Sequence, residues 1–331
     1  MNIGLKPFDR LTQAELNIWV KEGQQRSQLG QLPSYIPQLA QVNPQEFVVK
    51  ILTIPGPSYQ AGNEALRFPV MSVIKCFLLL NRLLELGEER VFQRVGVQPS
   101  DQPFNSLEQL ESDGGWPRNP MINSGAIALA GLLPGKDADT RCQYLCSWLN
   151  QFGDCQLVLD RDILESVRSA PNAKNQALVS TLAAAGYLEY PEITLDTYNQ
   201  ICCLSATISD LAKLGLLLLK PPNPQWQNAS RIVKALMMTC GLYETSGQFA
   251  VKVGVPTKSG VSGAVLSIIP DLGAIACYSP PLDSQGNSMG GLFLIEKMVE
   301  TVNYPHFSRS KCGLLASTGI ASEETEVCSG D

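Results

Sequence analysis

The sequence predicts an α/β fold of the α+β type, in which a mainly antiparallel sheet is built from segments near both ends of the chain. Three observations predict it. Residues 46–56 alternate in character and are rich in β-branched side chains, as in a strand. Strand patterns return in residues 247–260 and 263–281. Between about residues 68 and 238, apolar helical segments are joined by Pro, Gly and Asp loops, which indicates a helical lobe flanking the sheet.

The first elements are expected in the following order. A polar helix over residues 11–25 leads into a proline-punctuated loop over residues 30–40 and then into the strand at 46–56. A long apolar helix begins near Ser72 and is expected to end at Gly87, because charged residues follow that glycine. Further helices of the lobe are expected over residues 123–135, 175–188 and 206–220.

A hairpin and a helix complete the expected fold. The hairpin has its turn at residues 270–273, and the closing helix covers residues 290–302. We expect one domain over residues 1–307. Its sheet is built from about residues 45–65 and 245–300, and its helical lobe covers about residues 68–240. Residues 308–331 are rich in Ser, Thr and Glu and are expected to form a disordered polar tail.

The composition narrows the possible functions. The 331 residues are 44% hydrophobic with a net charge of −6, which argues against nucleic acid or an anionic membrane surface as partner. We find no stretch of transmembrane length and no signal peptide. The ten cysteines lie mostly in apolar runs, so we expect reduced thiols in a cytosolic protein. The single histidine, His306, and the lack of a CxxC motif argue against a Ser-His-Asp triad and a metal site.

A Ser-x-x-Lys motif stands at the start of the long apolar helix. Residues three apart share one face of a helix, so the Ser72 hydroxyl and the Lys75 amine can meet. Burial among leucines disfavours the charged amine, so Lys75 could act as a neutral base toward a serine nucleophile. The backbone N–H of Ser72 could form half of an oxyanion hole. Alternatively, Ser72 is only a helix N-cap, and the pattern arises by chance.

A second motif, TKSGVSGAV at residues 257–265, supports the first. Its Lys258-Ser259-Gly260 is close to the Lys-Thr-Gly that accompanies Ser-x-x-Lys in penicillin-recognising enzymes. A strand beside the serine would bring a second oxyanion donor, the backbone N–H of Val261. The alternative is a hairpin whose glycines merely permit a bulge. The two motifs in this order predict a serine acyl-transfer site.

Longer segments carry a family resemblance: residues 34–40 (SYIPQLA), 116–131 (WPRNPMINSGAIALAG), 237–250 (MMTCGLYETSGQFA), 255–265 (VPTKSGVSGAV) and 279–288 (SPPLDSQGNS). They resemble the serine-dependent glutaminase family over about residues 10–305. The resemblance implies a β-lactamase-like fold and hydrolysis of L-glutamine to L-glutamate and ammonia, without a metal or organic cofactor. It also implies a homo-oligomer, either a dimer or a tetramer, while the cytoplasmic location is expected from the cysteines and the lack of a signal peptide.

The resemblance also implies roles for individual residues. Ser72 is similar to the family nucleophile, Lys75 to its base, and Tyr243 to the tyrosine that relays the proton to the leaving amine. The positions that match substrate-binding residues are Tyr35, Ser72, Asn123, Asn175, Tyr198, Tyr243 and Val261. Amides and hydroxyls can bind an α-carboxylate and an α-amine without adding a charge. Taken singly, such asparagines are usually caps and such tyrosines usually pack.

The chain departs from the family at one position. The family typically carries a glutamate seven residues before the asparagine matched by Asn175, and that glutamate is expected to hold the substrate's ammonium. Here the position is Arg168, which cannot do so. The family's Arg-Asn pair is Lys174-Asn175. Glu165, one turn earlier, could reach into the site instead, or it could pair with Arg168.

Two rival functions remain open from sequence. A penicillin-recognising hydrolase would use the same nucleophile and base on a different substrate, but the NPMINSGAI segment and the lack of a secretion signal argue against it. A catalytically inactive homologue that binds small molecules is the second rival. The presence of Ser72, Lys75, Tyr243 and Lys258 argues against inactivity.

Overall fold

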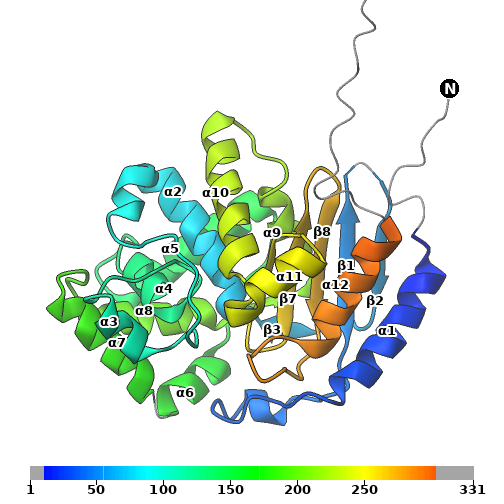
Figure 1. The fold of residues 1–331 in the computed structure, drawn as a ribbon, viewed down its shortest axis with the longest axis horizontal. Helices are drawn as coiled ribbons and strands as arrows, with labels where there is room; N and C mark the ends of the chain where they lie inside the picture. The colour runs from blue at the N-terminus through cyan, green and yellow to red at the C-terminus, as the bar shows by residue number, and fades with distance from the viewer. Residues whose placement is uncertain (1–10, 55, 171, 303–331) are drawn as a thin grey trace, which may run out of the picture.

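A five-stranded antiparallel sheet forms one half of the molecule in the computed structural model, and helices form the other half (Figure 1). The structure describes residues 11–54, 56–170 and 172–302, so the predicted tail at 308–331 lies outside the described residues. The strand order is β2-β1-β8-β7-β6. The strands are β1 (Val48–Thr53), β2 (Ser58–Ala61), β6 (Thr257–Ser259), β7 (Ala264–Ile269) and β8 (Gly273–Tyr278). A sheet built from segments near both ends of the chain was predicted, and it is confirmed.

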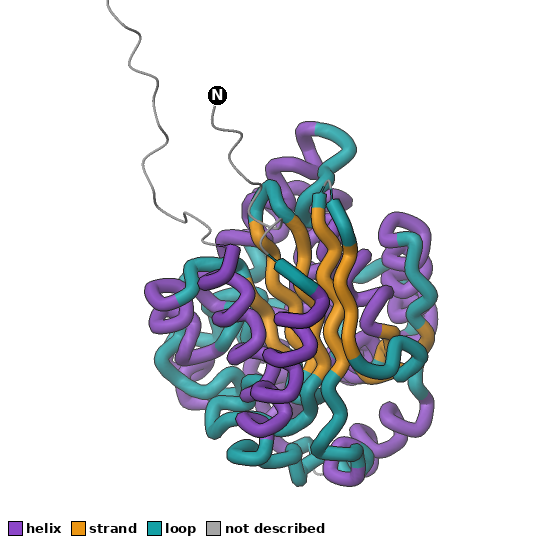
Figure 2. Tube along the Cα trace, turned by 90° about the vertical axis from the view of Figure 1, so that its right-hand side faces the viewer, coloured by secondary structure: helices purple, strands orange, loops and turns teal. Residues whose placement is uncertain are grey.

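Helices cover both faces of this sheet, as Figure 2 shows. Helices α1 (Gln13–Ser27) and α12 (Met289–Val302) pack together against one face, and α9 (Ile208–Leu217) packs against the other. Every residue of β7 and β8 is therefore buried. Gly215 of α9 permits close packing, since a Cβ at this position would lie 2.6 Å from that of Ala274. The helices at both ends of the chain and the turn between β7 and β8 were predicted and are confirmed.

The helical half surrounds a buried central helix, α2 (Ile74–Phe92). Gly87 (φ 79°, ψ 166°) has a non-helical backbone and divides α2 into two helical parts across a kink, so the long apolar helix is interrupted at the predicted residue and a second part runs on to Phe92. Glycine adopts this backbone conformation without steric cost, and helical geometry resumes beyond it. The other helices of this half are α3 (Leu107–Ser112), α4 (Asn123–Ala130), α5 (Ala138–Gly153), α6 (Arg161–Ser169), α7 (Ala173–Ala184), α8 (Pro191–Cys202) and α10 (Pro224–Cys240).

Two segments differ from the prediction. The first is a small sheet in the order β3-β5-β4, formed by β3 (Arg67–Pro69), β4 (Val158–Leu159) and β5 (Leu204–Thr207) within the part read as helical. Strands of two to four residues are too short to display an alternating pattern. The second is α11 (Ser246–Lys252), where a strand was predicted. Phe249 and Val253, four residues apart, both pack into the core beside β7. Side chains at this spacing share one face of a helix, so the segment is helical and not a strand.

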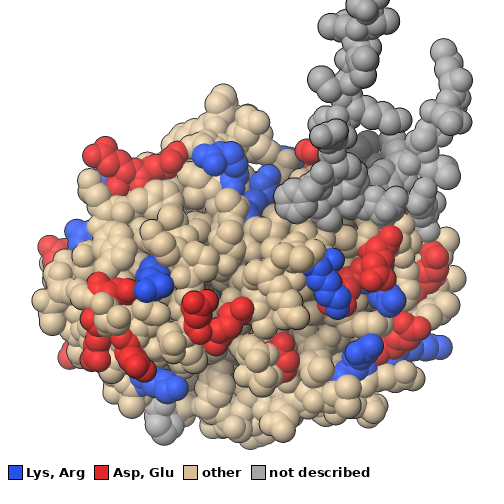
Figure 3. Space-filling view, in the orientation of Figure 1, with Lys and Arg blue, Asp and Glu red and all other residues tan. Residues whose placement is uncertain are grey.

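The distribution of surface charge and the state of the cysteines match what the composition predicted. Acidic and basic side chains are interspersed on the face in Figure 3, with wide neutral areas between them. The eight cysteines within the described residues are all unpaired thiols, and seven of them are buried. Among the helices that the structure describes, none has the length and apolar character needed to cross a membrane.

Candidate active site

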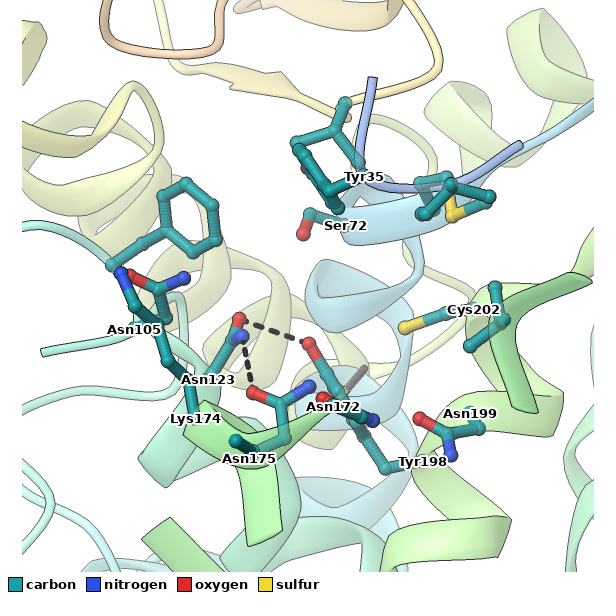
Figure 4. A pocket seen from close by; sticks show the side chains of 16 residues that line it. Tyr35, Ser72, Asn105, Asn123, Asn172, Lys174, Asn175, Tyr198, Asn199 and Cys202 are labelled. Carbon is teal, nitrogen blue, oxygen red and sulfur yellow. Dashed lines mark hydrogen bonds between the residues drawn. The ribbon is translucent and has the colours of Figure 1, made fainter. Parts of the chain in front are cut away.

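A cavity of about 400 Å³ lies where the start of α2 meets the β6–β7 turn and the ends of α6, α7 and α8. Its size is in the range of small-molecule sites. Figure 4 shows the side chains that line it. The lining residues are Tyr35, Ile36, Met71, Ser72, Phe104, Asn105, Asn123, Val167, Asn172, Ala173, Lys174, Asn175, Tyr198, Asn199, Cys202 and Val261.

Ser72 faces this cavity from a short 3₁₀ turn, Met71–Val73, directly ahead of α2. The N-cap of α2 is Val73, and no side chain caps this helix end, so Ser72 is not an N-cap. Met71 has a φ of 45°, a left-handed conformation that is uncommon for a residue other than glycine. Such strained conformations cluster at functional sites. The serine is 6% exposed, which leaves its hydroxyl accessible only from the cavity.

Lys75 is fully buried beneath Ser72, one turn further along the chain. Its amine donates hydrogen bonds to the Met121 carbonyl oxygen (3.2 Å) and to Asn123 Oδ1 (2.8 Å). Within the described residues we find no hydrogen bond from this amine to Ser72. Burial lowers the pKa of Lys75 from 10.5 to about 8, because a buried amine loses the solvation of its charged form. A substantial fraction of Lys75 is therefore neutral near physiological pH.

Lys258 is a second fully buried lysine near the first. Its amine donates to the carbonyl oxygens of Gly241 (2.9 Å) and Ser259 (2.7 Å) and lies 4.3 Å from the centre of the Tyr243 ring. Burial, and next the charge on Lys75, lower the pKa of Lys258 to about 7. Sequence reasoning recognised Lys258 as part of a motif but missed the electrostatic coupling of the two lysines. Only the folded chain brings these two residues together.

Tyr243 stands beside this pair in a strained backbone conformation, with a φ of 58°. Its hydroxyl donates a hydrogen bond to the Ser259 carbonyl oxygen (3.4 Å), and its ring packs on Phe104 with the centroids 4.7 Å apart. Burial raises the pKa of Tyr243 well above its usual value, and hydrogen bonding to Ser72 offsets part of that rise. The phenol therefore remains protonated and can pass a proton without forming a free phenolate.

The turn between β6 and β7 lies against the backbone of Ser72. A Cβ added to Gly260 would stand 2.8 Å from the Val70 carbonyl oxygen and 3.3 Å from the Ser72 nitrogen, so only glycine allows this close approach. Val261, the next residue, lines the cavity. Ser72 and Val261, whose backbone amides are the predicted oxyanion donors, thus both line the cavity.

Asn123 links the buried lysine to the floor of the cavity, as the dashed lines in Figure 4 show for two of its three bonds. Its Oδ1 accepts hydrogen bonds from Lys75 (2.8 Å) and from the Tyr198 hydroxyl (2.9 Å). Its Nδ2 donates to Asn175 Oδ1 (2.9 Å). Residues that are 48 to 75 positions apart in sequence therefore form one polar network. Tyr35, which is 55% exposed, stands at the opposite, outer side.

Arg168 and Glu165 lie outside this cavity. Arg168 donates to both carboxylate oxygens of Asp196 (2.9 and 2.7 Å) and lines an adjoining cavity of about 480 Å³. Glu165 lines a third, separate cavity with Pro37 and Gln38. Neither of the two alternatives for Glu165 is therefore seen: it does not line the site, and Arg168 pairs with Asp196 instead.

Several lining residues had no sequence signal. Asn172, Asn199 and Phe104 belong to no motif, and only the packing of α7 and α8 and of the segment before α3 brings them to the cavity. Within the described residues, no group of three or more His, Cys, Asp or Glu side chains is placed to hold a metal ion.

The comparisons with known proteins all find glutaminases. The family model described as Glutaminase matches residues 30–307. A protein named Glutaminase from Synechocystis sp. is 46% identical over 295 residues, covering 88% of this chain and 90% of its own length.

Solved structures agree with this result. The structure of the probable glutaminase ybaS is similar with a TM-score of 0.82 and 33% identity, over 90% of this chain and 100% of that one. The covalent complex of the Bacillus subtilis glutaminase YbgJ with 5-oxo-L-norleucine has a TM-score of 0.78 and 30% identity, over 88% of this chain and 98% of that one.

Proposed function

This chain belongs to the glutaminase family and is a glutaminase, and on that premise we propose that it hydrolyses L-glutamine through an ester of Ser72. In the first step, Ser72 Oγ bonds to the γ-amide carbon while the C–N bond breaks. The nitrogen leaves as ammonia with the proton that the serine gave up. In the second step, water cleaves the γ-glutamyl ester, which releases L-glutamate and restores the serine. Two such steps are easier than one direct attack of water on an amide.

The proposal rests most on one observation: a serine on a strained turn stands one helical turn from a fully buried lysine of lowered pKa. A neutral Lys75 amine accepts the Ser72 proton when substrate tightens the site, since catalytic hydrogen bonds are often longer before substrate binds. Tyr243 then relays this proton to the leaving nitrogen. The amides of Ser72 and Val261 stabilise the negative oxygen that develops during attack.

Substrate binding is assigned to the polar floor and the rim of the cavity. Asn123 and Asn175 are linked by a hydrogen bond, and Tyr198 donates to Asn123, so this floor is organised before substrate arrives. A preorganised floor avoids the entropy cost of ordering these side chains on binding. Tyr35 closes over the amide from the rim, and no step in this scheme requires a cofactor.

We further propose that the protein works in the cytoplasm as a homo-oligomer, either a dimer or a tetramer. The eight unpaired thiols among the described cysteines support a reducing compartment. The oligomeric state is proposed from the family resemblance.

Ammonia release from L-glutamine by the purified protein tests the proposal. We expect one glutamate to be formed for each ammonia. Ammonia release without stoichiometric glutamate would contradict the reaction. Turnover of nitrocefin at a higher kcat/KM than glutamine would instead favour a penicillin-recognising hydrolase, and an absence of both activities would favour an inactive homologue.

Replacing Tyr243 with phenylalanine tests the relay. We expect kcat to fall by about a hundredfold or more, because a positioned proton donor contributes this much to a reaction of this kind. The ring and its packing on Phe104 remain, so the variant should stay folded and should bind glutamate with unchanged affinity. Steady-state kinetics and glutamate titration separate the two effects. A normal kcat with weakened binding would show that Tyr243 holds substrate and does not transfer a proton.

A further inference from the structure

The lining of the active-site cavity holds no acidic side chain among the described residues, although a glutamine bound there would bring a charged α-amine. Of the residues that line the cavity, Lys174 is the only one that is a lysine, arginine, aspartate or glutamate. The remaining polar side chains are amides, hydroxyls and the Cys202 thiol. Lys75, behind Asn123, adds further positive charge whenever it is protonated. This environment suits a carboxylate and not an ammonium.

The acids that line the neighbouring cavities do not line the active-site cavity: Glu192 and Asp196 both lie on the adjoining one, where the Glu192 side chain is exposed. Asp196 lies on the adjoining cavity, where Arg168 donates to both of its oxygens and Gln200 donates to one of them (3.1 Å). Glu165 lines a separate cavity. A substrate ammonium in the active-site cavity would therefore have neutral acceptors but no described carboxylate beside it, and burying a charge without a counter-charge is costly.

A second cavity shares a wall with the active-site cavity. The adjoining cavity of about 480 Å³ shares three lining residues with it: Val167, Asn172 and Asn199. Both asparagine side chains appear in Figure 4. Within the described residues, neither of these two side-chain amides takes part in a hydrogen bond, so each can bind a ligand. A ligand that carries an amide group suits these two asparagines. An asparagine side chain can accept a hydrogen bond from the ligand N–H and can donate one to the ligand C=O.

From these observations, and resting on the proposed function, we infer that the preferred substrates are N-acylated L-glutamines. In this class the α-carboxylate is free and the α-nitrogen is a neutral amide. The γ-amide is cleaved at Ser72 as for glutamine, releasing ammonia and leaving the N-acylated glutamate. The acyl group lies along Asn172 and Asn199 toward the adjoining cavity, and Lys174 faces the α-carboxylate. Asn172 and Asn199 thus act as specificity-determining residues.

Ammonia release from N-acetyl-L-glutamine and from L-glutamine tests this inference directly. We expect kcat/KM to be about tenfold higher for the acetylated substrate, since the acetyl group removes the charge that the site cannot pair. A ratio above one supports the inference. A ratio below one, with glutamine hydrolysed efficiently, overturns it while the proposed function stands. Hydrolysis of neither amide overturns both.

The Asn172→Asp variant gives an independent test, because it places a carboxylate on the shared wall with almost no change of shape. A carboxylate that pairs with an ammonium should shift the ratio of the two kcat/KM values toward glutamine by about tenfold or more. Asn17→Asp is the matched control: it adds the same charge at an exposed position of α1, remote from the site, and should leave the ratio unchanged. A folded Asn172→Asp enzyme with an unchanged ratio would overturn the inference.

Glu165→Gln removes the partner for the ammonium that the sequence suggested. Because Glu165 lines a separate cavity, we expect its replacement to leave KM for glutamine unchanged. A tenfold rise in KM without a change in kcat would show that Glu165 reaches the substrate after all, and the inference would then be wrong.

Discussion

Replacement of Ser72 with alanine should abolish glutamine hydrolysis, with kcat falling by about a thousandfold or more. The loss is expected to be this large because no other group on the described cavity wall is positioned by a strained turn next to a buried, partly neutral lysine. Removing a nucleophile that works as part of a unit removes nearly the whole covalent pathway. The measurement is ammonia release under saturating glutamine, with thermal unfolding as the check that the variant is folded.

The matched control for this variant is Ser58→Ala at the exposed start of the edge strand β2. Ser58 lines neither the active-site cavity nor the adjoining one, so activity should be unchanged. Substantial residual turnover in a purified, folded Ser72→Ala protein would rule out the ester mechanism.

Replacement of Lys75 with alanine should lower kcat by about 10²- to 10⁴-fold, with a much smaller rise in KM. The amine acts on the serine proton and lies behind Asn123, and Lys75 is not itself among the residues that line the cavity. Lys75→Met, which fills more of the buried space, serves as a second variant in case the alanine protein is unstable. Lys213→Ala, at an exposed ion pair with Asp154, is the matched control and should retain full activity.

The dependence of kcat on pH is a second test of Lys75 as the base. Lys75 is protonated below its pKa of about 8 and cannot then accept a proton, so kcat of the wild-type enzyme should rise with pH up to about that value. The Lys75 variants should lose this rise. A normal kcat with weak binding, or an unchanged pH profile in Lys75→Met, would assign the base to another group. Lys258, whose pKa is lowered to about 7, would be the first to examine.

Local patterns were enough to predict the parts of the fold and site that depend on local spacing. Ser72 and Lys75 share one helix start, and the hairpin of β7 and β8 has its turn at the predicted residues. The periodicity of α1 and α12 was also visible in sequence. In each case the residues that decide the structure lie within a few positions of one another, so one stretch of chain carries the whole signal.

Features that depend on distant partners could not be predicted from sequence. The bond between Asn123 and Asn175 joins residues 52 positions apart, and Arg168 meets Asp196 across 28 positions. The charge on Arg168 alone could not show that it would turn away from the cavity. The strands of the small sheet are likewise stabilised by tertiary packing, since each is too short to be specified by its own pattern.

Labelling with 6-diazo-5-oxo-L-norleucine tests the central claim most directly, because the B. subtilis structure described above is a covalent complex formed with this compound. The protein would be treated until activity is lost, digested, and mapped by mass spectrometry. A serine nucleophile predicts one 5-oxo-L-norleucine group for each chain, bonded to Ser72 Oγ through the carbon that loses N2, with activity falling in proportion to labelling and glutamate protecting against it. Complete inactivation with the label on any other residue, or equal labelling of the Ser72→Ala protein, would contradict it.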